Sequence, residues 1–345
     1  MVMGCKYGSH RVVEPRGGLP QPALRLDNDF STLRDNEILV DVAALNIDSA
    51  SFTQIAGEAG GDLAKIEARL LAIVEERGKM QNPVTGSGGM FIGAVAQVGP
   101  ALEGRGLKRG DRIASLVSLS LTPLKIGKIL RIQPDIDRVE IQGQAVLFES
   151  GIYARLPEDM GEGLALAALD VAGAPAQTAR LVKPGDSVLI LGAGGKSGML
   201  TACEAMRRVG PGGRVVANIR SERDRAVLER LGLCHEIVLA DATQPLELLQ
   251  GALAANGGRE YDLVISCVNV QNTEMSAILP CREGGSVYFF SMATHFGRAA
   301  LGAEGVGKDL NMIIGNGYTR GHAESTLQLL RENPGLRQLF EERYV

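Results

Sequence analysis

The pattern of apolar and polar residues changes character near residue 160. Before that point it favours β-structure, and residues 37–47, EILVDVAALNI, are typical of a strand. Residues 61–77 instead follow the helical period, with apolar side chains on one face, charged side chains on the other, and Gly78 as a stop. The first part of the chain is therefore predicted to be β-rich with one inserted helix.

After residue 160, buried strands alternate with helices. Residues 161–182 predict one long helix of small residues, and residues 322–345 predict a C-terminal helix. The predicted strands between them are SVLILGAG, RVVANIR, CHEIVLAD, YDLVISCVN, GSVYFFSM and NMIIGNGY. Alternation at this spacing indicates βαβ units and a parallel sheet.

The length of 345 residues favours more than one domain. We expect a β-rich domain over residues 1–165, a doubly wound α/β domain over residues 166–320, and a helical segment over 321–345 that packs back towards the first domain. The fold class is accordingly α/β, with a parallel sheet in the second domain.

Composition excludes several classes of protein. Forty acidic residues stand against 36 basic ones, a formal net charge of −4, so neither nucleic acid nor a membrane surface is an expected partner. The five cysteines are widely spaced, which argues against a disulfide framework. A run of about 18 apolar residues, as a membrane span requires, does not occur. The first residues lack the apolar core of a secretory signal, so a cytoplasmic location is expected.

The strongest local signal is a glycine-rich turn between a buried strand and a helix. The strand ends at Leu191, and Gly192 is predicted to permit the tight turn. Gly195 would let backbone amides approach a pyrophosphate, and Gly198 would let the helix pack on the strand. The start of that helix is a site for an anion. A dinucleotide is the expected ligand, and a glycine turn without a ligand is the alternative.

The end of the following strand bears on the choice between NAD and NADP. An acidic residue there binds the ribose 2′-hydroxyl of NAD, whereas a basic residue tolerates the 2′-phosphate of NADP. Arg220 and Ser221 occupy this place, which favours NADP and leaves NAD open. The cofactor site is also expected to include Lys196, Ser197, Asp241, Cys267, Val268, Asn269, Ser291, Ala293 and Thr294.

The order of these segments resembles the medium-chain dehydrogenase/reductase superfamily. The similarity covers roughly residues 35–320 and is carried by EILVDVAALNI, by VKPGDSVLILGAGG, and by the late strand NMIIGNG. It implies a GroES-like catalytic domain before a Rossmann domain, with the active site in the cleft between the two.

Longer blocks resemble one branch of that superfamily, the L-erythro-3,5-diaminohexanoate dehydrogenase family. They extend from Gly4 to Val345 and include LNIDSASFTQI, KMQNPVTGSGGM, CVNVQNTEM and FFSMATHFGRAALGAEGVGKD. The resemblance implies NAD(P)-dependent oxidative deamination of (3S,5S)-3,5-diaminohexanoate to 5-amino-3-oxohexanoate and ammonium, in lysine fermentation. A zinc-independent NADPH quinone or enal reductase, and a non-enzymatic NADPH-binding module, are the alternatives.

The positions that bind catalytic zinc elsewhere in the superfamily hold different residues here. They are Asp48, Ser87 and Asp170, a poor donor set because zinc prefers Cys thiolate and His nitrogen. Residues 122–145 stand where other members carry a four-cysteine lobe. We therefore expect an enzyme without a bound metal.

The same positions supply candidate catalytic residues. Asp170 and Asp48 are expected to bind the substrate amines and accept a proton, with Ser87 beside them. Asp170 is expected to lie buried within a helix of small residues, where a carboxylate needs a partner. A turn-forming role is the alternative for Asp48.

Three further polar residues attract attention near the end of the chain. His295 follows a predicted strand and is a candidate acid or base, although a structural role is the alternative. Lys308 is a candidate for binding the substrate carboxylate from a loop that closes over the site. His322 is expected to serve as a polar helix cap.

Finally, GSVYFFSM and NMIIGNG are expected to be neighbouring apolar strands at the edge of the nucleotide-binding sheet. An uncovered edge of this kind favours pairing with a second copy of the chain. A homodimer through the edge of the Rossmann sheet is therefore expected.

Overall fold

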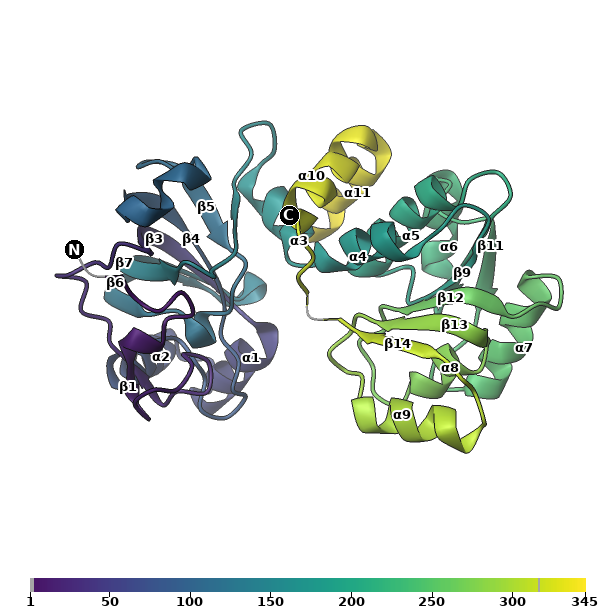
Figure 1. The fold of residues 1–345 in the computed structure, drawn as a ribbon, viewed down its shortest axis with the longest axis horizontal. Coiled ribbons are helices and arrows are strands. Elements are labelled where there is room, and N and C mark those ends of the chain that lie inside the picture. Colours follow the sequence, from purple (N-terminus) through teal and green to yellow (C-terminus); the bar gives the residue numbers. More distant parts are fainter. Residues whose placement is uncertain (1–2, 316) are drawn as a thin grey trace. The chain divides into compact units, whose positions relative to one another are not determined.

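The computed structural model describes residues 3–315 and 317–345. It divides into two compact units, Met1–Glu158 and Asp159–Val345 (Figure 1). The boundary expected at 165/166 falls inside a helix and lies instead at 158/159, because Asp159 is bound within the second unit. Its carboxylate accepts hydrogen bonds of 2.8 and 2.9 Å from the guanidinium of Arg331.

The first unit is built on an antiparallel sheet, as its β-rich pattern predicts. Six strands lie in the order β6-β7-β3-β4-β5-β8, with β3 at the centre between β7 and β4. The strands are β3 (Glu37–Ile47), β4 (Gly89–Val98), β5 (Arg112–Ser115), β6 (Leu124–Gln133), β7 (Arg138–Phe148) and β8 (Tyr153–Arg155). A separate pair consists of β1 (Val12–Glu14) and β2 (Arg25–Leu26).

Two helices cover this sheet, of which the sequence pattern predicts one. The predicted helix is α2 (Leu63–Arg77), which begins after the capping residue Asp62 and ends at Gly78, where φ is 65°. The other, α1 (Ser49–Glu58), has a weak apolar face, with Phe52 and Ile55 as its buried hydrophobic residues.

A buried ion pair anchors the N-terminal segment to the central strand. Both carboxylate oxygens of Glu37 bind Arg11, at 2.5 and 2.7 Å, and His10 lies 2.8 Å from one of them. Burial alone would raise the pKa of Glu37, but these bonds and one from the Arg34 N–H hold it at about 2. The Glu37 carboxylate is therefore a firm structural anchor.

The second unit is a doubly wound parallel sheet, which confirms the predicted fold. Its strand order is β11-β10-β9-β12-β13-β14, so the winding reverses between β9 and β12. The strands are β9 (Ser187–Leu191), β10 (Arg214–Ile219), β11 (Glu236–Leu239), β12 (Tyr261–Ser266), β13 (Cys281–Phe289) and β14 (Asn311–Ile314). The helices that alternate with them are α5 (Lys196–Val209), α6 (Arg225–Arg230), α7 (Pro245–Ala255), α8 (Glu274–Ile278) and α9 (Phe296–Gly305).

Two predicted helices are each broken in two. Residues 161–182 form α3 (Glu162–Leu169) and α4 (Gly173–Leu181). Residues 322–345 form α10 (His322–Glu332) and α11 (Pro334–Tyr344), because the residue before Pro334 is disfavoured in helical geometry. Both C-terminal helices pack on α3 or α4. The segment 321–345, which was expected to be separate from the nucleotide-binding domain, therefore belongs to the second unit.

Short 3-10 helices complete the fold, namely η1 (Ser9–Arg11), η2 (Pro100–Arg105), η3 (Leu119–Leu121), η4 (Pro134–Ile136) and η5 (Glu222–Asp224). Within residues 3–315 and 317–345, helices of the length and hydrophobicity needed to span a membrane are absent.

Candidate functional site

The glycine-rich turn joins β9 to α5 with the geometry that its sequence predicts. Gly192 has a φ of 75°, a conformation in which other residues are strained. A Cβ atom on Gly198 would lie 2.2 Å from the carbonyl oxygen of Gly192, so the helix can pack this close only with glycine there. Gly195 precedes α5 without a side-chain cap, which leaves the first amides of the helix available to an anion.

A pocket of about 1110 Å³ surrounds this turn at the carboxyl ends of the parallel strands. This is where doubly wound sheets bind their ligands. The sequence predictions that line it are Gly192, Gly195, Lys196, Ser197, Arg220, Asp241, Cys267, Val268, Asn269 and Ser291. Cofactor residues that were predicted after five different strands therefore lie together in one pocket.

Four predicted cofactor residues do not line the pocket; their contacts are with the backbone segments around it. Gly198 acts through helix packing, and Ser221 accepts a hydrogen bond from the N–H of Arg223. The N–H groups of Ala293 and Thr294 donate to Ser291, at 3.2 Å each. These bonds order the segments after β10 and β13.

Several lining residues escaped the sequence reasoning. Asn218 is buried at the end of β10, and its side-chain amide donates to the carbonyl of Ala240 at 3.0 Å, next to the pocket. Asp224 lines the pocket together with Arg343, which α11 contributes, and the two form an ion pair of 3.2 Å. A contact between residues so far apart in the chain leaves no local pattern by which to predict it.

The expectation that Asp170 is buried within a helix is wrong. The residue caps the C-terminus of α3, and its side chain is 56% exposed. Helix α3 ends at this residue and α4 begins at Gly173, where a Cβ atom would lie 2.6 Å from the backbone of Gly317. The Asp170 carboxylate accepts a 2.5 Å hydrogen bond from the Lys196 ammonium, and both groups line the pocket.

In the first unit, Asp48 and Ser87 belong to a polar cluster at the start of α1. Asp48 caps this helix, and its Oδ1 accepts a hydrogen bond from the Ser51 N–H. The hydroxyl of Ser51 lies 2.7 Å from that of Ser87 and 2.6 Å from that of Thr85. The remaining pair of hydroxyls, on Thr85 and Ser87, are 3.0 Å apart. The turn-forming alternative thus explains the Oδ1 of Asp48, which accepts the Ser51 N–H, and leaves its Oδ2 unexplained.

This cluster is richer in acceptors than in donors. Three hydroxyl groups carry three protons, and their three mutual contacts can use them all. The Oδ2 of Asp48 is buried, with no hydrogen-bond partner among the residues that the structure describes. Buried polar atoms are normally hydrogen-bonded. The arrangement suits a ligand that brings N–H groups, such as an amine.

The histidines have structural explanations. His295 caps α9, where its ring accepts a hydrogen bond from the Arg298 N–H at 3.3 Å and stacks on Phe296. His322 is buried in the first turn of α10, and burial lowers its pKa. The residue that caps α10 is Gly321, so the expectation that His322 is the cap is wrong.

Lys308, which was expected to bind the substrate carboxylate from a loop that closes over the site, has other partners in the structure. Its ammonium lies 2.5 Å from the Glu260 carboxylate and 2.7 Å from the Cys281 carbonyl oxygen. These partners lie at the amino ends of β12 and β13, and the pocket lies at the carboxyl ends. Lys308 therefore binds groups at the end of the sheet that lies opposite the pocket.

Comparison with known proteins identifies the family. L-erythro-3,5-diaminohexanoate dehydrogenase of Acetoanaerobium sticklandii is 66% identical over 343 residues, 99% of either chain. The enzyme of the same name from Fusobacterium nucleatum subsp. nucleatum is 62% identical over 346 residues, 100% of either chain. The chain belongs to the L-erythro-3,5-diaminohexanoate dehydrogenase family. The family predicted from the sequence, and its class of oxidoreductase, are thereby confirmed.

Comparisons with a family profile and with two solved structures agree with this family. The sequence profile of the L-erythro-3,5-diaminohexanoate dehydrogenase N-terminal domain matches residues 10–157. The solved structure of AibC is similar with a TM-score of 0.54 at 18% identity, over 87% of this chain and 81% of that one. The quinone oxidoreductase from Coxiella burnetii also has a TM-score of 0.54, at 20% identity, over 91% and 84% of the two chains. These likenesses confirm the predicted fold.

Metal ligands do not gather in the part of the chain that the structure describes. Among residues 3–315 and 317–345, no group of three or more His, Cys, Asp or Glu side chains is placed to hold a metal ion.

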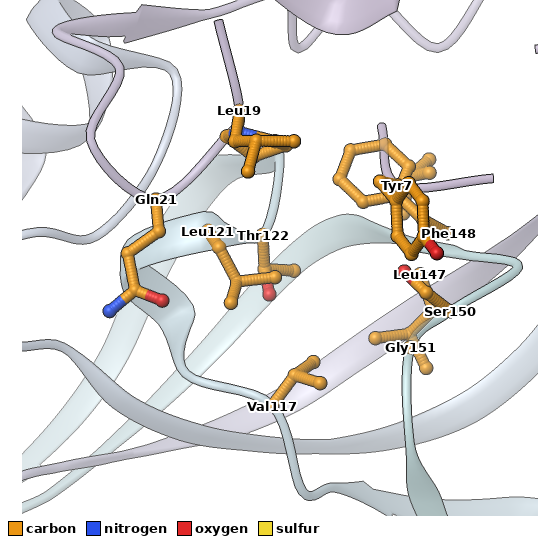
Figure 2. A pocket seen from close by; sticks show the side chains of 12 residues that line it. Tyr7, Leu19, Gln21, Val117, Leu121, Thr122, Leu147, Phe148, Ser150 and Gly151 are labelled. Atoms are coloured by element: carbon orange, nitrogen blue, oxygen red, sulfur yellow. The ribbon is translucent and has the colours of Figure 1, made fainter. Parts of the chain in front are cut away.

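A second pocket, of about 490 Å³, lies in the first unit and contains none of the predicted site residues (Figure 2). In this view Tyr7 and Phe148 stand on one side and Gln21 on the other. One wall of this pocket includes Pro20 and Gln21. The buried ammonium of Lys79 donates hydrogen bonds to their carbonyl oxygens, of 2.8 Å to Pro20 and 3.0 Å to Gln21. Burial, with nearby Arg77, lowers the pKa of Lys79 to about 8.

Proposed function

We propose that the protein is an NAD(P)-dependent dehydrogenase that converts (3S,5S)-3,5-diaminohexanoate to 5-amino-3-oxohexanoate and ammonium. The observation that carries this proposal is the identity of 66% and 62% to two relatives of that name over the whole chain. The glycine-rich pocket of the second unit supports it, because the reaction needs a dinucleotide site.

The pocket suits the nicotinamide cofactor, which accepts the hydride from carbon 3 of the substrate when bound. The close approach of Gly198 to Gly192 shapes the turn for a pyrophosphate, which Lys196 and Ser197 at the start of α5 would hold. Arg220 would lie towards the adenosine ribose. Asn269 and Ser291 would lie towards the nicotinamide.

In the first unit, the acceptor-rich cluster suits the substrate amine. Loss of the C3–H hydride from a neutral amine leaves a C3=N imine, and water then replaces nitrogen to give the ketone and ammonium. The exposed Thr85 and the half-buried Ser87 offer oxygen atoms to the amine N–H groups, and the buried Ser51 holds both hydroxyls in place. The unpaired Oδ2 of Asp48 can take the proton that the ammonium must lose before oxidation.

Asp170 also stays a candidate for a substrate ammonium, because its exposed carboxylate lines the cofactor pocket. Its bond to Lys196 gives it a second possible task, that of holding the lysine in place. His295 is a weaker candidate, since helix capping already explains it.

A spectrophotometric assay tests the proposal. Purified protein is mixed with the diamino acid and either NAD⁺ or NADP⁺, and formation of the reduced nicotinamide is followed, with ammonium measured in parallel. Reduction of a quinone or an enal by NADPH is the control reaction. Equal yields of reduced cofactor and ammonium are expected. Turnover of the quinone or enal without turnover of the diamino acid would favour the alternative reductase.

Three further features form part of the proposal. The donor set Asp48, Ser87 and Asp170 supports catalysis without zinc. The exposed edge of β14, with Ile314 at 55% exposure, supports a homodimer through the parallel sheet. The third feature is that the reaction belongs to lysine fermentation in the cytoplasm; the sequence resemblance to the family supports the pathway, and the lack of an apolar signal core in the first residues supports the compartment.

A further inference from the structure

A carboxylate borders the glycine-rich turn of the second unit. Asp224, in η5 after β10, approaches Gly194 so closely that a Cβ atom on this glycine would lie 2.6 Å from Oδ2. Both residues line the cofactor pocket. This proximity explains the glycine at 194, because any other residue would displace the Asp224 side chain.

The carboxylate creates an electrostatic difficulty for the proposed cofactor. The amides of this turn and the start of α5 are suited to a pyrophosphate, which is negatively charged. A carboxylate next to that position repels an anion, and such repulsion is strong where solvent access is limited. The Asp224 side chain is only 16% exposed.

Arg343 supplies the compensating charge. Its guanidinium lies 3.2 Å from Asp224 Oδ1, and its side chain is only 23% exposed. The other nearby cations contribute less. Arg223 stands 3.9 Å from Asp224 but is 82% exposed, and the Lys196 ammonium is bound to Asp170.

Helix α11 holds Arg343 in this place. Leu336, Leu339 and Phe340 are its buried residues, and Phe340 packs edge-on against Tyr344 at 5.0 Å between ring centroids. Tyr344 also lines the pocket, with its ring 5.8 Å from the Lys196 ammonium. Two neighbouring residues of this helix therefore contact groups that border the glycine-rich turn: Arg343 contacts Asp224, and Tyr344 contacts Lys196.

We propose that Arg343 is a positioning residue of the cofactor site, which neutralises Asp224 and so allows the glycine-rich turn to bind a pyrophosphate. The inference rests on the proposed nicotinamide cofactor and assigns part of its site to α11.

The test compares Arg343→Gln, Asp224→Asn and the double variant by titration with NADH, ADP-ribose and adenosine. Arg343→Gln should raise the Kd of NADH and ADP-ribose about tenfold or more, because a lost charge partner leaves Asp224 uncompensated. Adenosine has no pyrophosphate, and its affinity should not change. The double variant should recover binding to within about threefold of the wild type, since neither charge remains.

The controls separate this role from a loss of folding. Arg337→Gln alters the same helix at a residue that pairs with Glu341, and it should leave the Kd of NADH unchanged. Melting temperatures of all variants are measured alongside. A double variant as weak as Arg343→Gln, or an Arg343→Gln variant that binds as the wild type does, overturns the inference. A wild type that binds none of NADH, NADPH and ADP-ribose refutes the proposed cofactor itself, and the inference with it.

Discussion

The Lys196 ammonium lies 2.5 Å from the Asp170 carboxylate, so two residues expected to contact different ligands bind each other. Lys196 is the first residue of α5, and Asp170 caps α3. The pair links the glycine-rich turn to the helix that precedes the nucleotide-binding sheet. Any role of Asp170 in catalysis therefore has to be separated from its effect on Lys196.

The variant Asp170→Asn makes that separation. If Asp170 binds the substrate ammonium or moves its proton, kcat/KM for the diamino acid should fall by about a hundredfold. The Kd of NADH should change by less than about threefold, because an ion pair with an exposed partner contributes little. Steady-state kinetics and cofactor titration measure both. Near-normal turnover with weakened NADH binding would show that Asp170 only positions Lys196.

The hydroxyl cluster gives a second prediction. Ser51→Ala removes the oxygen that contacts both Thr85 and Ser87, so KM for the diamino acid should rise by about tenfold. The matched control is Ser49→Ala, two residues earlier, whose hydroxyl binds Asp137 instead. An unchanged KM in the Ser51 variant would argue that the cluster has no contact with substrate.

The buried pair of Glu37 and Arg11 governs stability in acid. Because the pKa of Glu37 falls from 4.5 to about 2 on folding, its contribution is complete above pH 4.5 and is lost as the pH falls towards 2. Glu37→Gln should lower the free energy of unfolding at pH 7 by about 3–5 kcal/mol, since the buried Arg11 loses its buried carboxylate partner and keeps the exposed Asp27 as its counter-charge.

Denaturant titrations at pH 7 and pH 3 measure this effect, and the gap between variant and wild type should narrow in acid. Asp27→Asn is the control, because the exposed Asp27 lies 3.6 Å from Arg11 and should cost less than about 1 kcal/mol. A gap that is independent of pH would contradict the assigned role of Glu37.

Catalysis should not need a metal. The activity of the purified protein with the diamino acid is expected to survive prolonged treatment with a chelator, since Asp48, Ser87 and Asp170 are a poor donor set for zinc. Elemental analysis checks the same point. One zinc per chain, together with loss of activity on its removal, would reverse this interpretation.

The edge of β14 should mediate dimer formation. Ile314→Asp places a charge on that edge, and analytical ultracentrifugation should then report the mass of a monomer. Leu246→Asp, on the equally exposed surface of α7, should remain a dimer. A wild-type monomer at micromolar concentration would remove the basis of the prediction.

Local patterns in the sequence predicted the elements well where one physical rule dominates. The central strand 37–47 was predicted to the residue, because its run of Val, Ile and Leu follows the turn residues Asp35 and Asn36. The glycine-rich turn was equally clear, because Gly192 and Gly198 each meet a specific backbone requirement.

The errors arose where distant segments meet. Asp170 is exposed at the end of α3, close to the point where Gly173 meets the distant Gly317. Lys308 is bound by Glu260 and Cys281, which lie at the amino ends of two strands. Arg343 reaches the pocket only because α11 packs on α3. The pattern of apolar and polar residues within each segment does not indicate these contacts.

The bond between Asp159 and Arg331 also bears on how such a protein can evolve. It joins the first residue of the second unit to α10, near the C-terminal end of that unit. The chain passes from one unit to the other once, after Glu158. Each unit is thus one uninterrupted stretch of coding sequence. A single recombination event at this junction can give the nucleotide-binding half a new partner, so the chemistry of the first half can diversify while the cofactor half is inherited intact.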